Sequence, residues 1–302
     1  MNVKKWIKEN TSSLVGKKVA ITGSTGGLGR ELCGYLLGLG ASLVLMDRNK
    51  AKSDALKLEL EAKHPDAVIE QITLDLESIE NVEDACEKLI ELGADVLIHN
   101  AGAYDIPRHK CSTGFDNVFQ INFISPYYMM RRLYPYFIEK NGRMVFVSSI
   151  AHNYSKIDKD DIDFWERKAS SLVYGNAKRH LMFSLYEFLA REMDMRMHIS
   201  VTHPGIAFTG ITNHYPAWLF FIIKYPMKII FMKPRIACLS ILKGVFEKTE
   251  YKTWIGPAIF NVWGRPKKKK LNTCDEEESA EIFLRAEKIY KNIKHSSSEE
   301  KQ

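Results

Sequence analysis

The sequence predicts an α/β fold, a doubly wound parallel sheet of about seven strands with helices on both faces. Short apolar and β-branched runs alternate with longer amphipathic stretches over the first 205 residues. Runs that are apolar throughout are typical of parallel strands, because helices cover both faces of such a sheet. A glycine-rich turn directly follows the first run, where the chain passes from strand to helix.

The order of elements follows from the apolar runs and the amphipathic stretches between them. The predicted strands cover residues 18–22, 43–46, 68–74, 96–99, 143–148 and 198–202, with a short strand-like piece at 254–255. The predicted helices cover residues 28–39, 50–63, 79–92, 114–140 and 172–193. Alternation of strand and helix gives right-handed crossovers, so the strands should end at one edge of the sheet, where open α/β sheets bind ligands.

The chain beyond residue 205 departs from this alternation. Residues 215–223 (YPAWLFFII) form the most apolar stretch, a helix is predicted at 234–248, and acidic residues 275–278 begin a last helix before a disordered tail at 295–302. Because no linker is evident, we predict a single domain over residues 1–302. It divides into a cofactor and catalytic core at 16–210, a substrate-binding flap region at 211–265, and a C-terminal helix with a polar tail at 266–302.

The composition is that of an ordinary globular protein and excludes several classes of function. The 43 basic and 37 acidic residues leave a net charge of +6, too small and too dispersed for a nucleic-acid-binding surface. Five widely spaced cysteines without a CxxC pair predict neither a disulfide framework nor a metal site, and they indicate a reducing compartment.

Membrane insertion is not expected either. The nine uncharged residues at 215–223 fall short of the roughly 20 that a membrane helix needs. No signal-peptide core precedes the first strand. We therefore expect a cytoplasmic protein, in which residues 215–232 form a flap over a pocket, an interface or a membrane-peripheral surface.

The turn at residues 22–29 (TGSTGGLG) has the composition of a Rossmann-type phosphate-binding loop. Glycines let the backbone turn sharply, approach a pyrophosphate closely and start a helix whose amides face the phosphates. The spacing satisfies both TGxxxGxG and TGxxGxxG. The residues predicted to bind the cofactor here are Gly23, Ser24, Thr25, Gly26, Gly27, Leu28 and Gly29.

Asp47, at the tip of the second strand, favours NAD. A carboxylate at this position can accept hydrogen bonds from both ribose hydroxyls and would repel a 2′-phosphate. Arg48 follows directly and could instead pair with that phosphate, so NADP is the alternative.

Tyr174 and Lys178 form a YxxxK pair one helical turn apart, which places the phenol and the ammonium on the same helix face. A free tyrosine titrates near about 10, and a neighbouring ammonium should lower that pKa toward a range useful for proton exchange. Ser149, at the tip of the fifth strand, can donate a hydrogen bond to a substrate oxygen, and Ser148 is the alternative.

Together these motifs resemble the short-chain dehydrogenase/reductase family over residues 18 to about 210. The resemblance implies that Asn122 completes a proton relay behind Lys178. It also implies that Asp75 and Leu76 lie at the adenine, and that Asn100-Ala101-Gly102 matches an NNAG motif in which His99 replaces the first asparagine. Further family matches are Pro204, Gly205 and Thr209, beside the nicotinamide. Family members are often homodimers or homotetramers built through helices such as 114–140 and 172–193.

The resemblance therefore implies an NAD(P)-dependent oxidoreductase that interconverts an alcohol and a carbonyl. The long insert between Ser149 and Tyr174, together with the SSIAH motif at its start, is similar to that of retinol dehydrogenase-like members. The apolar residues beyond Gly205, among them Trp218, Phe220 and Phe221, predict a substrate wall that suits a bulky apolar alcohol or carbonyl such as a retinoid, a steroid or a lipid-like compound, with a buried helix or a dimer interface as the alternative. Two alternatives stay open: a dinucleotide-binding sensor or scaffold without turnover, and an epimerase or dehydratase. No metal is expected in the site.

Overall fold

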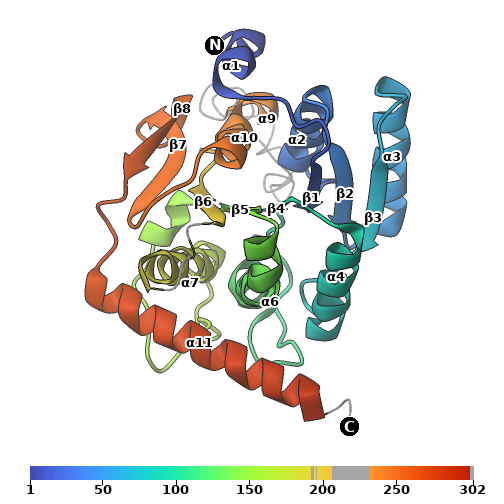
Figure 1. The fold of residues 1–302 in the computed structure, drawn as a ribbon. Coiled ribbons are helices and arrows are strands. Elements are labelled where there is room, and N and C mark those ends of the chain that lie inside the picture. Colours follow the sequence, from blue (N-terminus) through green and yellow to red (C-terminus); the bar gives the residue numbers. More distant parts are fainter. Residues whose placement is uncertain (192–193, 195, 206–231, 300–302) are drawn as a thin grey trace, which may run out of the picture.

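The computed structural model describes residues 1–191, 194, 196–205 and 232–299. Their strands form one sheet in the order β3-β2-β1-β4-β5-β6-β7-β8 (Figure 1). The strands are β1 Lys18–Thr22, β2 Ser42–Asp47, β3 Ile69–Thr73, β4 Val96–His99, β5 Arg143–Val147, β6 His198–Thr202, β7 Thr253–Ile259 and β8 Trp263–Lys270. All neighbours pair in parallel except β7 and β8, which are antiparallel.

The strand order reverses between β1 and β4, because β2 and β3 lie on one side of β1 and the later strands on the other. The chain leaves the carboxyl ends of β1 and β4 toward opposite faces of the sheet, and this reversal is the position at which open α/β sheets bind ligands. The fold thus brings the segments after β1, β2, β4, β5 and β6 to one edge, as the alternation of elements predicted.

Helices cover both faces of the sheet (Figure 1). One face carries α2 Gly27–Gly38, α3 Lys50–Lys63, α9 Pro234–Ala237 and α10 Leu239–Phe246, with α1 Val3–Asn10 packed beside them through Trp6. The other face carries α4 Ile79–Leu92, α5 Asn117–Phe119, α6 Ser125–Glu139 and α7 Ser170–Arg191. Each face has its own apolar core, which explains why the central strands are apolar throughout.

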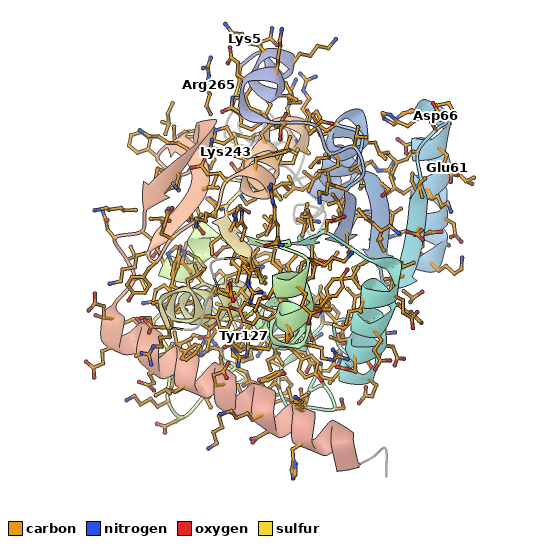
Figure 2. All side chains as sticks on the ribbon, in the orientation of Figure 1. Lys5, Glu61, Asp66, Tyr127, Lys243 and Arg265 are labelled. Atoms are coloured by element: carbon orange, nitrogen blue, oxygen red, sulfur yellow. The ribbon has the colours of Figure 1, made fainter. Side chains whose placement is uncertain are left out.

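The last helix, α11 Glu276–Glu299, lies across α6 and α7 (Figures 1 and 2). Its apolar face buries Ile282, Phe283 and Ala286 in the core on that side of the sheet. The Tyr127 hydroxyl donates a 2.6 Å hydrogen bond to Glu287. Because α11 covers the outer side of both long helices, any assembly through α6 and α7 would have to involve it.

Four elements differ from the sequence prediction. The sheet has an eighth strand, β8, because the lysine run pairs antiparallel with β7. The helix expected from residue 114 begins at Asn117, since Gly114 has a φ of +79° and Asp116 caps the amides of Val118 and Phe119. Helix α1 was not predicted, and the tail expected to be disordered is helical as far as Glu299.

The apolar stretch at 215–223 and Thr209 lie outside the described residues. Within the described part of the chain, no helix has both the length and the apolar character needed to cross a membrane.

Candidate active site

The glycine-rich turn joins β1 to α2 and needs its glycines for two close approaches. Gly23 has a φ of +67°, and a Cβ there would lie 2.9 Å from the Ala101 Cα. A Cβ at Gly29 would lie 2.8 Å from the Ser24 Cα. These glycines therefore let the turn fold tightly against the segment after β4 and leave the first amides of α2 facing the carboxyl edge.

Asp47 is buried beneath this turn, with 4% of its surface exposed. One carboxylate oxygen accepts from the Thr25 amide and the Thr25 hydroxyl, both at 3.1 Å. The other accepts from the hydroxyls of Ser24 and Ser53. A carboxylate offers about four lone-pair sites, so the protein itself fills all of them. Asp47 therefore holds the turn in place through four hydrogen bonds.

Arg48 projects from the same strand end with most of its side chain exposed. Its guanidinium pairs with Glu77 at 2.8 Å, and the other Glu77 oxygen accepts from the Nε2 of His109 at 2.8 Å. Cys111 lies close enough that Glu77, His109 and the thiol could surround a metal ion. However, Asn117 donates to the Nδ1 of His109, which leaves the proton on the Nε2 that donates to Glu77. Coordination through Nε2 would require loss of that proton, so hydrogen bonds account for the cluster.

Asn100 ties the end of β4 to the end of β1. Its amide nitrogen donates to the carbonyl oxygens of Thr22 and Gly23 at 3.1 and 3.0 Å, and the Ala101 amide donates to the Thr22 hydroxyl at 3.0 Å. His99 turns away from the edge and stacks on Phe146, with ring centroids 4.4 Å apart. Its burial lowers the pKa to about 3, so the ring is neutral and belongs to the core.

Asp75 and Leu76 follow β3 and act within the protein as turn residues. The Asp75 carboxylate accepts from the Glu77 amide at 3.0 Å, and the Leu76 carbonyl accepts from the Ser125 hydroxyl at 2.6 Å. Both residues lie at the carboxyl edge beside Asp47, where the adenosine half of a dinucleotide would lie in this fold.

Tyr174 and Lys178 lie on α7, opposite the end of β5. The Lys178 ammonium is buried, donates to the Val147 carbonyl at 3.0 Å, and stands 5.7 Å from the centre of the Tyr174 ring. Tyr104 packs edge-on against Tyr174 with ring centroids 5.4 Å apart. The YxxxK spacing therefore places the Tyr174 ring and the Lys178 ammonium on the same side of α7.

Ser149 is the serine that meets the phenol. Burial raises the pKa of Tyr174 to about 12, and a hydrogen bond with the Ser149 side chain, which lowers that pKa, has the smaller effect. The hydroxyl of Ser148, by contrast, is buried and has no hydrogen-bond partner among the described residues. Burial also lowers the pKa of Lys178 to about 8. The net shift of the Tyr174 pKa is therefore upward, whereas the sequence analysis expected the ammonium to lower that pKa.

Asn122 lies in a π-helical segment, Gln120–Ile124, and its side chain is fully buried. Its amide nitrogen donates to the carbonyls of Ala103 and Val118, both at 2.8 Å, and its carbonyl oxygen has no hydrogen-bond partner among the described residues. A Cβ at Gly102 would lie 2.8 Å from that oxygen and 3.6 Å from the Lys178 ammonium. Gly102 therefore keeps open a small polar space between Asn122 and Lys178.

Pro204 and Gly205 follow β6 at the same edge. Gly205 has a φ of +82°, which favours glycine, and a Cβ there would lie 2.7 Å from the Val262 carbonyl. Thr209, which was expected near the nicotinamide, falls outside the described residues.

The sequence analysis missed a network of hydrogen bonds and one ion pair behind the site. This network joins α7 to the first turn of α11 and to the residues just before it. Arg179 and Glu278 form a largely buried two-point ion pair. Arg179 also donates to the His152 carbonyl at 2.9 Å, and Glu278 accepts from the Ile157 amide at 3.2 Å. The pair thereby clamps the loop that follows Ser149.

His152 is the second part of this network. Its Nδ1 donates to the Ser149 carbonyl at 2.7 Å, and its Nε2 accepts from the Thr273 hydroxyl at 3.0 Å. Burial lowers the pKa of His152 to about 4, which keeps the ring in this neutral form. Only the SSIAH motif placed His152 near the site in the sequence, and nothing there indicated Thr273, Arg179 or Glu278.

The residues present fit a nicotinamide dinucleotide at this edge. The glycine-rich turn can fold tightly only because a Cβ at Gly23 or Gly29 is absent, and it ends at the first amides of α2, which suit a pyrophosphate. The buried side-chain oxygens of Asn100 and Asn122 have no partners among the described residues and lie next to the edge. The buried ammonium of Lys178 and the exposed guanidinium of Arg48 are cationic groups at this edge that suit a dinucleotide.

Comparisons with known proteins agree with this geometry. A sequence model of the family described as short chain dehydrogenase matches residues 17–219. Oxidoreductase calI of Penicillium decumbens is 34% identical over 200 residues, which cover 63% of this chain and 58% of that protein. Retinol dehydrogenase 14 of Mus musculus is 28% identical over 256 residues, which cover 76% of each chain.

Solved structures show the same fold. An uncharacterised protein from Mycobacterium paratuberculosis matches with a TM-score of 0.71 and 22% identity, over 94% of this chain and 96% of that chain. A short-chain dehydrogenase from Sphingobium yanoikuyae, in complex with NADPH, matches with a TM-score of 0.58 and 21% identity, over 76% of this chain and 83% of that chain.

Proposed function

The chain belongs to the short-chain dehydrogenase family of NAD(P)-dependent alcohol and carbonyl oxidoreductases, and we propose that Tyr174 is its proton donor and acceptor on a bulky apolar substrate. The observation that carries the proposal is the meeting of Ser149, Tyr174 and Lys178 at the carboxyl edge, on two elements that the fold brings together. A nicotinamide cofactor, when bound, supplies or accepts the hydride.

In the reduction direction Tyr174 donates its proton to the carbonyl oxygen of the substrate, and in oxidation its phenolate takes the hydroxyl proton. The Ser149 hydroxyl orients the substrate oxygen and stabilises charge that develops on it. The Lys178 ammonium holds the nicotinamide ribose and favours the phenolate. The buried carbonyl oxygen of Asn122, beside Lys178, completes the proton relay behind the lysine.

The protonation state favours reduction at neutral pH. A phenol whose pKa is raised to about 12 is almost fully protonated at pH 7 and can donate without a prior ionisation. Oxidation needs the phenolate, so its rate should rise with pH over the range in which reduction is flat.

For the cofactor we propose NADP(H), with Arg48 as the selecting residue. Asp47 was expected to favour NAD, but its four acceptor sites are filled by the turn and α3. Arg48 is exposed at the end of β2, and it shares its carboxylate partner, Glu77, with His109. A 2′-phosphate would gain a charge-assisted hydrogen bond there.

Titration of NADPH and NADH, each followed by tryptophan fluorescence, tests this choice. We expect Arg48→Ala to weaken NADPH binding about tenfold, since a hydrogen bond to a charged group contributes about 1.5–3 kcal/mol, and to leave NADH binding nearly unchanged. Arg30→Ala, which removes another surface arginine paired with a glutamate, is the matched control. Tighter binding of NADH by the wild type would instead favour Asp47 as the selecting residue.

The substrate proposal is supported by the aromatic surroundings of the phenol. Tyr104 packs against Tyr174, and Tyr154, half exposed, follows Ser149 closely in the chain. One relative, which this chain matches over 76% of that relative's length, is named a retinol dehydrogenase. Retinal, a steroid ketone and a long-chain aldehyde should therefore be reduced with a higher kcat/KM than a short aldehyde. Equal values for the short aldehyde would contradict the apolar substrate class, and lack of turnover with normal cofactor binding would favour a dinucleotide sensor.

A further inference from the structure

The tip of the β7–β8 hairpin exposes large apolar side chains. Ile259 is 52% exposed, Phe260 85% and Trp263 37%. Single exposed apolar residues are common on protein surfaces, but three within five positions form a patch that marks an interaction site. We propose that this tip, together with the basic side chains of β8 behind it, docks the protein on an anionic lipid surface.

The tip is held in a defined shape. Phe260 and Asn261 have φ values of +51° and +59°, a backbone region that bulky side chains rarely adopt. The His203 Nε2 donates to the Asn261 carbonyl at 2.9 Å, and Lys269 donates to the Pro257 carbonyl at 2.5 Å and to the side chain of Asn261. These bonds fix the hairpin loop to the end of β6. A strained backbone that the surroundings hold in place is typical of functional loops, and here it presents Phe260 to solvent.

The charges behind the tip select an anionic partner. Side chains alternate along a strand, so Trp263, Arg265 and Lys267 project from the same face of β8. Arg265 and Lys267 are both exposed, and neither forms an ion pair with any described residue, whereas Lys268 on the other face pairs with Glu247 and Glu250. Figure 2 places Arg265 at the outer edge of the molecule. An aromatic tip followed by two unneutralised cations suits the interface of a bilayer with anionic headgroups, where apolar side chains insert and cations meet phosphates.

A second copy of the chain is a poor occupant for this surface. β8 is the edge strand of the sheet, and pairing with another β8 would bring the cations at 265 and 267–270 against their own copies. Pro266 also lacks the amide that such pairing needs. These features protect an edge strand from association, but they do not explain why the adjoining tip exposes Ile259 and Phe260.

The position of the tip gives the docking a consequence for catalysis, and this part rests on the proposed function. β7 runs parallel to β6, so its carboxyl end lies at the edge that holds Ser149 and Gly205. The Val262 carbonyl sits against Gly205. A lipid surface at the hairpin tip would therefore lie beside the rim of the active site, and an apolar substrate could enter it directly from the bilayer.

Co-sedimentation of the full chain with vesicles tests the docking without any enzyme assay. We expect binding to vesicles of phosphatidylcholine with phosphatidylserine, at least tenfold weaker binding to phosphatidylcholine alone, and weakening by salt. Ile259→Ser with Phe260→Ser, and separately Arg265→Glu with Lys267→Glu, should each reduce binding to the anionic vesicles by about tenfold or more. Leu58→Ser with Val68→Ser, two exposed apolar residues on and after α3, is the matched control and should bind as the wild type does.

Normal NADPH binding and circular dichroism of the variants confirm that they fold. Wild-type protein that stays in solution with both vesicles overturns the proposal. So does undiminished vesicle binding by the Ile259/Phe260 variant, which would place the contact elsewhere. Association of the wild type into dimers that the Arg265/Lys267 variant abolishes would overturn it in favour of a second copy. Vesicle binding needs no turnover, so an absence of vesicle binding would overturn the docking proposal and leave the proposed catalytic function standing. A protein that binds vesicles but shows no turnover would contradict the proposed function and leave the docking proposal standing.

Discussion

The nucleotide half and the catalytic half of the carboxyl edge satisfy their polar groups in different ways. In the nucleotide half, Asp47 accepts four hydrogen bonds from the protein and the Asn100 amide nitrogen donates two, although the Asn100 side-chain oxygen is buried without a partner among the described residues. In the catalytic half, the oxygens of Asn122 and Ser148 are buried without a partner among the described residues. Burial also holds Tyr174 and Lys178 away from their ordinary pKa values.

The difference indicates two kinds of preorganisation. In the nucleotide half, the hydrogen bonds of Asp47 and of the Asn100 amide nitrogen stabilise the turn whether or not a ligand binds. The catalytic half keeps destabilising features that ligand groups can relieve, above all the buried Lys178 ammonium, whose hydrogen bond to the Val147 carbonyl brings no negative charge. Substitutions in the first half should therefore cost stability, whereas substitutions in the second should cost activity and in one case improve stability.

The largest effect is expected in the catalytic half, at Tyr174. Tyr174→Phe keeps the ring that packs on Tyr104 but removes the oxygen that exchanges a proton with the substrate. Loss of a general acid or base costs about 10²–10⁴-fold in rate, so kcat should fall by that much while NADPH affinity stays within about twofold. Tyr154→Phe removes a neighbouring, half-exposed phenol and should be nearly normal. A fully active Tyr174→Phe enzyme would contradict the mechanism.

Lys178→Met should separate activity from stability. The ammonium is buried, and its pKa falls from 10.5 to about 8, so between these values the unfolded chain binds more protons than the folded one. The folded state therefore carries a penalty at neutral pH that disappears as the pH rises through that window. One pKa unit corresponds to about 1.4 kcal/mol, so the variant should be more stable at pH 7 by up to about 3 kcal/mol.

Thermal unfolding from pH 7 to 10 measures this gain, which should shrink above pH 8 as the wild-type lysine loses its charge. The same variant should bind NADPH weakly and turn over slowly, because the ribose loses its cation. A destabilised Lys178→Met protein at pH 7 would mean that the bond to the Val147 carbonyl outweighs the cost of burying the charge.

Asp47→Ala, in the nucleotide half, should lower the stability of the protein, in contrast to Lys178→Met. It leaves the hydroxyls of Ser24, Thr25 and Ser53 without their acceptor, and each buried unsatisfied group costs about 1–3 kcal/mol. Water that enters the space will recover part of this, so we expect a loss of about 2 kcal/mol in the free energy of unfolding by urea. Binding of NADH and NADPH should weaken to the same extent because the turn that serves both is disturbed. Loss of NADH binding alone would show that Asp47 contacts the ribose.

The sequence predicted most of what local patterns determine. Tyr174 and Lys178 are one helical turn apart, and Ser149 ends a strand, so their meeting follows from a single crossover and was found. The hydrogen bonds of Asp47 come from two separate segments, and whether a carboxylate faces a turn or a ligand depends on side-chain packing that no periodicity encodes. β8 was missed because a run of lysines has no strand pattern, and its pairing with β7 decides its conformation.

The network of Arg179 and Glu278 lies furthest from the reach of sequence patterns, because its members are 99 positions apart, and its substitution should have the smallest effect. Glu278→Gln keeps one oxygen that can accept from the Arg179 Nε and the Ile157 amide, but it removes the charge and replaces the second acceptor with an NH2 group that cannot accept from Arg179. A neutral hydrogen bond is also weaker than a charged one by about 1 kcal/mol. The loop after Ser149 should then be held less firmly. We expect kcat to fall about fivefold with KM for NADPH unchanged, since the clamp contacts the serine loop and not the nucleotide half. Glu276→Gln, two residues earlier in an exposed pair with Lys252, is the matched control and should leave kcat unchanged. If Glu278→Gln lowers thermal stability but not kcat, the network supports α11 alone, and the catalytic half is organised entirely by β5 and α7.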